Sequence, residues 1–362
     1  MSLSRTADAA PPARVTRPTA EVWDTFATAH PQGHLLQSSA WAELKGGVGW
    51  NVQRVAVERT GAIVAGAQVL IKRRLGLAAA YVPRGPLLSG DAAADDMLLA
   101  ALDRMARRAL AVFLRVEPNL LEGDPRAQAL HQRLTARGFV QATPIQPRSS
   151  VHLNLAPEPE RLLAAMSKGH RADIRRAARE GVAVREGLDA DDLESFHAIM
   201  QETGARANFA IHSREYYRRA WELFSAGGHA RLLLAEREGR TVGTCMVFAW
   251  AGEGLYLYGG STDEGLRAGA NHALQWQALQ WARDAGCTSY DFWGIPDALG
   301  QAALAQDEAE RARLEAQAQS DPLIGVYRFK KGFGGETVRY LPAYDRRYIP
   351  LLYDLWQRRV AS

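Results

Sequence analysis

The sequence has little of what marks several classes of protein. Only two of its 362 residues are cysteine, Cys245 and Cys287, and neither lies in a metal-ligand spacing, which fits a reducing compartment. No apolar run approaches the roughly 18 residues that would span a bilayer. The N-terminus has no charged region followed by an apolar region, as a signal peptide would. We therefore expect a cytoplasmic protein without transmembrane helices.

The signatures of several enzyme classes are also missing. The nine histidines lack the H-E-x-x-H and H-x-E…C-x-x-C spacings of zinc enzymes. The sequence contains no G-x-S-x-G nucleophile elbow and no Walker A phosphate loop. We therefore predict no metal site, and the sequence argues against hydrolysis of nucleoside triphosphates.

The composition is that of a soluble globular protein, with 47% hydrophobic and 23% charged residues. A chain of 362 residues is long enough for two domains. The net charge of +4 favours anionic partners, which include phosphates, RNA and an anionic membrane face. It does not choose among them.

The order of predicted elements repeats along the chain. Residues 1–18 have no apolar period and predict a disordered lead-in. The turn Glu-Arg-X-Gly occurs at 58–61 and at 236–239, each time between two predicted strands. A predicted helix and strand follow in both halves, at 95–116 and at 271–293. This duplication predicts two α/β domains of one type, at 19–150 and 151–362, with a short helical insertion at 297–320 in the second.

A first basic segment lies between the two halves. Residues 167–181 predict a helix that carries Lys168, and Arg171 and Arg175 share one stripe of it. The stripe is either an ordinary solvated face or a surface that faces phosphates.

A second basic segment covers residues 325–335. Arg328, Lys330 and Lys331 are mixed there with aromatic residues that include Phe329. The alternation of aromatic and cationic residues predicts a strand, and the glycines that follow would let a polyanionic ligand approach the backbone. A basic hairpin on a solvated surface is the alternative.

Three further side chains have two readings each. Lys45 ends a predicted helix that also carries Trp41, where its charge could simply favour the C-terminus. Tyr256 and Tyr258 alternate on a predicted strand, so we expect them on one face, lining either a cleft or the core. The turn at 267–270 precedes a helix, as in one half of an N-acetyltransferase, but its glycines are sparse for a pyrophosphate loop.

Five blocks in order, over about residues 35 to 345, resemble the FemABX family of non-ribosomal peptidyltransferases. The blocks are Gln37 with Trp41-X-X-X-Lys45; Arg171-X-X-Ile174-Arg175-X-Ala177 with Gly181-Val182; Asn271-His272-X-Leu274-X-Trp276; Tyr290-Asp291-Phe292-Trp293-Gly294-Ile295; and Phe329-Lys330-Lys331-Gly332-Phe333-Gly334-Gly335.

This resemblance implies an α/β fold of two tandem N-acetyltransferase (GNAT)-like domains, with mixed sheets flanked by helices. It also implies an aminoacyltransferase that moves an amino acid from aminoacyl-tRNA to an amine on the stem peptide of a peptidoglycan precursor. The precursor would be a UDP-MurNAc-pentapeptide or lipid II, and aminoacyl-tRNA would be a co-substrate, with no resident cofactor. The short insertion at 297–320 resembles the members that lack a long two-helix arm.

The resemblance also implies roles for single residues. Lys45 and Arg206 would hold the diphosphate, Phe329 and Lys330 match the pair at the tRNA terminus, and Tyr256 or Tyr258 matches a cleft tyrosine. Trp41 would lie with the substrate-binding residues.

The chemistry needs few groups, because an amine that attacks an activated ester gives an amide. Lys330 can supply a cation where negative charge develops on the carbonyl oxygen. A general base is harder to identify: for Asp291 the sequence favours a structural corner, and deprotonation could be assisted by the substrate. An acyl-CoA-dependent N-acyltransferase and a non-enzymatic module that binds RNA or an anionic surface remain alternatives, and peripheral contact with the inner membrane face is compatible with the basic surface.

Overall fold

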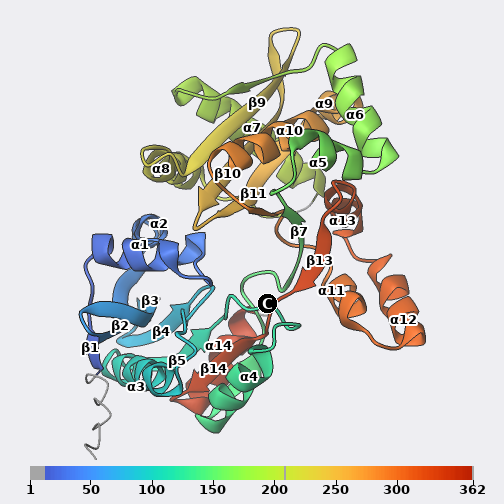
Figure 1. The fold of residues 1–362 in the computed structure, drawn as a ribbon. Coiled ribbons are helices and arrows are strands. Elements are labelled where there is room, and N and C mark those ends of the chain that lie inside the picture. Colours follow the sequence, from blue (N-terminus) through green and yellow to red (C-terminus); the bar gives the residue numbers. More distant parts are fainter. Residues whose placement is uncertain (1–12, 208, 361–362) are drawn as a thin grey trace, which may run out of the picture.

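The computed structural model of the protein describes residues 13–207 and 209–360, which form two mixed α/β domains (Figure 1). Each domain is built on a sheet of seven strands. The prediction of a mixed α/β fold is confirmed. Among the described residues, no helix is long and apolar enough to cross a membrane.

The first sheet has the strand order β1-β2-β3-β4-β5-β14-β6. Strands β4 and β5 run parallel because helix α3 connects them, and the other neighbours are antiparallel. The elements up to β6 are β1 (Arg14–Thr16), α1 (Ala20–Ala29), the 3-10 helix η1 (Leu35–Gln37), α2 (Ser39–Gly46), β2 (Asn51–Arg59), β3 (Ala62–Arg74), β4 (Leu77–Val82), α3 (Ala92–Arg108), β5 (Ala111–Val116), α4 (Ala127–Ala136) and β6 (Phe139–Ala142).

The second sheet has the order β13-β7-β12-β11-β10-β9-β8, in which β11 and β12 are the parallel pair. Its elements are β7 (Ser149–Asn154), α5 (Pro159–Ala165), α6 (Lys168–Arg179), β8 (Ala183–Glu186), α7 (Ala190–Ala207), α8 (Arg214–Ser225), β9 (Ala230–Arg237), β10 (Arg240–Trp250), β11 (Glu253–Ser261), α9 (Asp263–Ala268), α10 (Ala270–Asp284), β12 (Ser289–Asp291), α11 (Asp297–Leu304), α12 (Glu308–Ala318), α13 (Ile324–Lys331) and β13 (Glu336–Arg339).

The end of the chain returns to the first domain. Strand β14 (Ala343–Arg347) lies between β5 and β6, and helix α14 (Pro350–Val360) packs on β5. Both are drawn in red against the first domain in Figure 1. The second domain therefore does not extend to residue 362 as predicted, because β14 and α14 belong to the first domain. The insertion of β14 into the first sheet depends on pairing between distant segments and leaves no local pattern in the sequence.

The N-terminal segment also differs from the prediction. Of the predicted disordered lead-in, residues 1–12 lie outside the described residues. Strand β1 pairs antiparallel with β2, with Val15 opposite Val57. Disorder is therefore the wrong prediction for Arg14–Thr16, since three residues at a sheet edge are too few to show a period.

Within the basic segment 325–335, residues 325–331 belong to helix α13 and do not form the predicted strand. Within α13, Ile324 and Tyr327 are one helical turn apart, and both pack against the core of the second domain. The predicted access through its glycines is also wrong for Gly332, where an added Cβ would lie 1.9 Å from the ring of His170. Four alternating residues are compatible with the period of a strand or with that of a helix, and the packing of Tyr327 favours the helix.

One apolar core joins the two domains. Trp23 and Leu36 from the first domain are fully buried in the same cluster as Phe224 and Phe248 from the second. Full burial of such a side chain contributes about 1.5–3 kcal/mol. The shared core therefore fixes how the two sheets face each other, and the polar site described next lies at this junction.

Candidate active site

Lys330 is buried where α13 meets the segment after β12. Only 6% of the residue is exposed to solvent. Its Nζ donates to the carbonyl oxygens of Trp293 and Gly294, each at 2.8 Å. Burial lowers the pKa of Lys330 to about 7, against the opposing charge of Asp291. An ammonium group has three donors, so one remains after these two bonds.

Asp291 holds the segment that binds Lys330. It is fully buried at the end of β12 and accepts from the backbone nitrogen of Trp293 at 2.6 Å and from the hydroxyl of Ser150. Its second oxygen lies 3.3 Å from His152 Nε2 and accepts from Tyr340 at 3.4 Å. Burial alone would raise the pKa of Asp291, but the charge of His152 and the bonds from His152 and Ser150 lower it. A charged carboxylate with so many donors has a positioning role.

The left-handed backbone of Trp293 depends on this carboxylate. Trp293 has φ +63°, which costs energy for a bulky residue. The bond from its nitrogen to Asp291 offsets that cost. Because the same residue offers its carbonyl to Lys330, Asp291 and Lys330 are connected through one strained residue.

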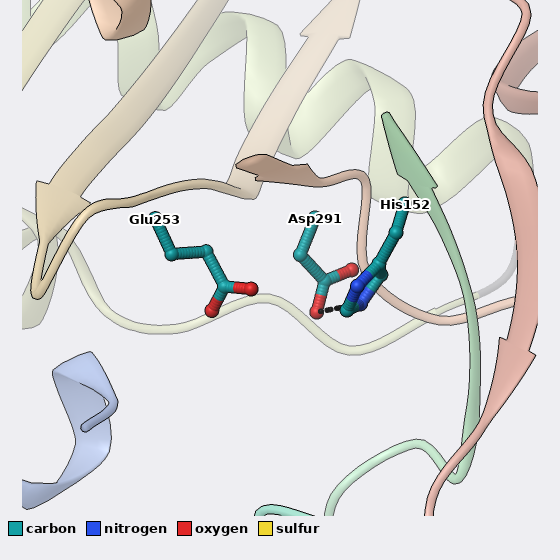
Figure 2. A group of neighbouring side chains, drawn as sticks. All are labelled: His152, Glu253 and Asp291. Atoms are coloured by element: carbon teal, nitrogen blue, oxygen red, sulfur yellow. Dashed lines mark ion pairs between the residues drawn. The ribbon is translucent and has the colours of Figure 1, made fainter. Parts of the chain in front are cut away.

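Glu253 lies beside Asp291 and His152 at the start of β11 (Figure 2). Its side chain is 18% exposed, and no hydrogen bond to its carboxylate is found among the described residues. Burial, and then the charge of Asp291, raise the pKa of Glu253 to about 7. Glu253 was not among the residues predicted from the sequence, since a glutamate beside a hairpin turn carries no local signal of burial.

The first domain contributes two donors to this cluster. Burial, and then Arg84, lower the pKa of His34 well below its usual range. His34 Nδ1 accepts from the nitrogen of Leu36, so neutral His34 carries its proton on Nε2. That Nε2 is buried, has no hydrogen-bond partner among the residues that the structure describes, and lies 4.0 Å from Glu253. Arg84 stacks over Tyr340, 3.7 Å from its ring centre.

His152, Glu253 and Asp291 also satisfy the spacing of a metal site. One ligand atom from each lies within 4.8 Å of the others. Asp291 and His152 already bind each other, and Arg84 places a second cation at the cluster. The charge of Asp291 and the bond to it outweigh burial and raise the pKa of His152, so His152 favours a proton. The donors therefore suit proton sharing better than a metal ion, and the absence of a metal stays a prediction.

Lys45 lies in an aromatic cage between the domains. Ser38 caps α2 by accepting from the nitrogen of Trp41, which places Lys45 in the last turn. Its Nζ lies 4.7 Å from the ring centre of Trp41 and 4.9 Å from that of Tyr216, and it donates to the Tyr216 hydroxyl at 2.8 Å. Burial lowers the pKa of Lys45 to about 8. A cation held by ring faces can turn towards an anion.

Tyr256 and Tyr258 do not share a face, contrary to the prediction. The register between β10 and β11 shifts between Met246 and Val247, so that Tyr258 and Tyr256 oppose successive residues. This bulge adds one residue to β11. Tyr256 packs into the core beneath α10, whereas Tyr258 packs into the core between the domains. Of the two, only Tyr258 lies near the Lys45 cage, in edge contact with the ring of Tyr217.

Phe329 points from a neighbouring face of α13, since successive residues of a helix are about 100° apart. Its ring centre is 5.1 Å from His272 and 5.3 Å from Phe333. His170 Nε2 lies 2.7 Å from the carbonyl oxygen of Phe329. Phe329 is half-buried, so a partly open aromatic group adjoins Lys330.

The predicted phosphate-binding cations are arranged unevenly. Arg171 is occupied, since its Nη1 donates to the carbonyls of Ala164 and Met166. Lys168 and Arg175 are exposed on α6. The remaining two are exposed on α13: Arg328 donates to Gln319 at 2.6 Å, and Lys331 donates to Gly335 at 2.7 Å.

Arg206 lies at the last turn of α7. It donates to the carbonyl oxygen of Ser261 at 2.7 Å and pairs with Asp263 at 3.1 Å. Ser261 ends β11, three residues after Tyr258. Arg206 therefore lies at the end of the strand that carries Tyr258.

A family model described as the FemAB family matches residues 19–242 and 237–358. The chain belongs to the FemAB family. The predicted family is thereby confirmed, and so is the prediction of an aminoacyltransferase.

Two similar proteins carry the name lipid II:glycine glycyltransferase. The one from Staphylococcus saprophyticus subsp. saprophyticus is 27% identical over 349 residues, which cover 76% of this chain and 83% of that protein. The one from Staphylococcus aureus is 25% identical, over 75% of this chain and 82% of that protein.

Solved structures show the same fold. The crystal structure of FemX has a TM-score of 0.82 at 22% identity and covers 94% of this FemAB chain and 99% of its own. A tandem GNAT protein from the clavulanic acid biosynthesis pathway has a TM-score of 0.53 at 12% identity, covering 93% and 98%. The predicted architecture of two GNAT-like domains is confirmed.

Proposed function

We propose that the protein transfers an amino acid from aminoacyl-tRNA to an amine on the stem peptide of a peptidoglycan precursor, which is UDP-MurNAc-pentapeptide or lipid II. The two lipid II:glycine glycyltransferases support this substrate class. The observation that carries the proposal is Lys330, a buried ammonium fixed by two carbonyls next to a charged carboxylate in a FemAB chain. The proposed location is cytoplasmic, where charged tRNA is found, and the reaction needs no resident cofactor.

Lys330 acts at the ester carbonyl of the donor in this proposal. Its free N–H stabilises the negative charge that develops on the carbonyl oxygen when the amine attacks. Removal of a comparable donor costs about 10²–10³-fold in rate. Phe329 adjoins Lys330 with one partly open face, and stacking of the terminal tRNA base there would place the ester beside the ammonium.

Glu253 takes the proton of the attacking amine in this proposal. The amine nitrogen forms a bond to the carbonyl carbon, the bond from that carbon to the ribose oxygen breaks, and the ribose oxygen takes up the proton that Glu253 accepted from the amine. Glu253 is suited to accept the amine proton because its carboxylate is unbonded and partly exposed, with a pKa of about 7. Asp291 is less suited because its oxygens are already saturated with donors.

The acceptor is held by the cage between the domains. Lys45 would turn from the Trp41 and Tyr216 rings to one phosphate, and Arg206 would hold the other. Tyr258 and Trp41 belong to the same apolar cluster and would contact the acceptor there. Tyr256 lies beneath α10 and has no direct contact with the acceptor in this proposal.

The tRNA backbone would lie along the exposed cations of α6 and α13. Lys168 and Arg175 are free of ion pairs among the described residues. Arg328 and Lys331 point outward from the helix that carries Lys330. Arg171 would support α6 through its carbonyl bonds rather than contact phosphate.

The packing of α6 on α10 supports tRNA over acyl-CoA as the donor in this proposal. In that alternative, the pyrophosphate would lie at the N-terminus of α10. Helix α6 covers this position: an added Cβ on Gly269 would lie 2.7 Å from the carbonyl oxygen of Asp173. His272, in the first turn of α10, is 3.4 Å from the same aspartate.

The test is transfer of label from charged tRNA to UDP-MurNAc-pentapeptide or lipid II, with acetyl-CoA as a parallel donor. We expect a labelled peptide from tRNA alone. No transfer from any charged tRNA to either acceptor would contradict the proposal. If the protein bound tRNA but transferred nothing, and Lys330→Met bound tRNA as well as the wild type, the non-enzymatic binding module would be favoured.

A further inference from the structure

Two exposed leucines occupy backbone positions that favour glycine. Leu75 lies at the tip of the β3–β4 hairpin with φ +50° and is 94% exposed. Leu110 lies between α3 and β5 with φ +57° and is 60% exposed. The left-handed region is unfavourable for a bulky side chain. Both residues therefore cost conformational energy and, in the isolated protein, bury little apolar surface in return.

The second domain occupies the equivalent positions differently. The β10–β11 hairpin has Ala251 where the β3–β4 hairpin has Leu75, and Ala251 packs against the first domain near Gly33. The loop between α10 and β12 has Gly286, with φ +84°, where the first domain has Leu110. The fold therefore accepts a small residue at both places, and the leucines are not required by the turns.

Leu75 and Leu110 lie at the same end of the first sheet, where the parallel strands β4 and β5 begin. The nitrogen of Ala78 donates to the carbonyl oxygen of Leu110 at 3.1 Å, which joins the two loops. Leu351, in the first turn of α14, is 81% exposed. Helix α14 packs where both strands begin, because Leu352 and Tyr353 share an apolar cluster with Leu77 and Val112. We call Leu75, Leu110 and Leu351 the leucine edge.

Cations surround the leucine edge. Arg74 and Arg108 each lie one or two residues before a leucine, are exposed, and have no ion pair among the described residues. Arg73 donates to the carbonyl of Ala109 at 3.0 Å, and Arg347 lies over the ring of Tyr353. Two acidic residues lie nearby: Asp103, which pairs with Arg107, and Asp354 of α14. The edge is therefore apolar at its tips and basic around them.

We propose that the leucine edge docks the protein on an anionic phospholipid bilayer. Leucines at the tips of rigid turns can enter the boundary between head groups and acyl chains, while arginines beside them contact anionic head groups. The basic rim selects an anionic surface over a second copy of this basic chain. The docking is separate from the proposed transfer chemistry, and it would bring the enzyme to a lipid-linked acceptor.

Vesicle flotation with the full-length protein tests this proposal. We expect binding to vesicles of phosphatidylglycerol and phosphatidylcholine, and none to phosphatidylcholine alone. Leu75→Asn with Leu110→Asn should weaken binding on the order of tenfold for each leucine. Asparagine tolerates the left-handed region, so the midpoint of thermal unfolding should not fall. Leu188→Asn, at a 71% exposed leucine of the second domain, is the matched control and should bind as the wild type.

The charged rim gives a second arm. Arg74→Ser with Arg108→Ser should weaken binding to anionic vesicles about fivefold for each cation, and transfer to a soluble acceptor should not change in either double variant. Wild-type binding by the double leucine variant, or no binding by the wild type, would overturn the proposal. It would also be overturned if the arginine variant lost tRNA binding alone, or if the leucine variant only converted a dimer to a monomer.

Discussion

Two lysines, half-buried Lys45 in the first domain and buried Lys330 in the second, are held by different kinds of partner. Lys45 is surrounded by the rings of Trp41 and Tyr216 and by one hydroxyl. Lys330 is fixed by two backbone carbonyls, and Asp291 holds the segment that supplies them. Rings and a hydroxyl release a cation easily, whereas two carbonyls keep it in place. The comparison indicates that Lys45 serves affinity for a ligand and Lys330 serves the rate of a reaction.

The largest effect should come from Lys330→Met, which retains the length of the side chain and removes the charge. We expect kcat for transfer to fall about 10²–10³-fold, with the KM for the acceptor little changed. Lys331→Met is the matched control on the same helix; its Nζ binds the nearby Gly335, and we expect only a higher KM for tRNA. Equal losses in the two variants would remove the distinction between them.

A smaller loss should follow Asp291→Asn. The amide cannot oppose the effect of burial on Lys330, so the pKa of Lys330 should fall below about 7. Because Lys330 acts as a cation, the high-pH limb of kcat should move to lower pH, with a loss of about tenfold or more at pH 8. The pH dependence of kcat measures this shift. An unchanged limb with a uniform loss would indicate a purely structural role for Asp291.

Lys45→Met should act on affinity. We expect the KM for a diphosphate acceptor to rise about tenfold, with kcat changed less than about threefold. Glu43→Gln, at an exposed position of the same helix, is the control and should leave both constants unchanged. A fall in kcat alone would contradict the role drawn from the aromatic cage.

The smallest effect should come from Tyr216→Phe. It removes the hydroxyl that accepts from Lys45 and keeps the ring beneath the cation. A hydrogen bond to a charged group is worth about 1.5–3 kcal/mol at most. In this account the bond exists in the free enzyme and not in the complex, so its loss destabilises only the free enzyme. Acceptor affinity should therefore stay the same or rise by a few fold. Isothermal titration with a UDP-muropeptide measures it. A tenfold loss of affinity would show that the hydroxyl itself contacts the ligand.

Local patterns predicted the elements that carry their own signal. The strand at 111–116 matches β5, and the helix predicted at 271–284 matches α10 within one residue. The ordered motifs identified the family, and they contain Lys45, Lys330 and Asp291. These features depend on residue type and spacing along a continuous segment.

Features that depend on distant pairing were not predictable in the same way. The bulge that separates Tyr256 from Tyr258 appears only when β11 is aligned with β10. The position of β14 in the first sheet appears only when its pairing with β5 is known. Glu253 becomes a candidate base only because β12 and the first domain bury it. Each of these features arises from tertiary contacts and not from a local period.

The most direct test of the central claim, that transfer occurs between Glu253 and Lys330, is the pH dependence of single-turnover transfer by the wild type and Glu253→Gln. Glu253 must be ionised, so the rate should rise with pH through about 7; Lys330 must be protonated, so it should fall again above about 7. We predict a bell-shaped profile for the wild type. In Glu253→Gln the rate should be lower, with the rising limb lost and the falling limb retained. A variant that keeps both limbs at the wild-type rate would contradict the account.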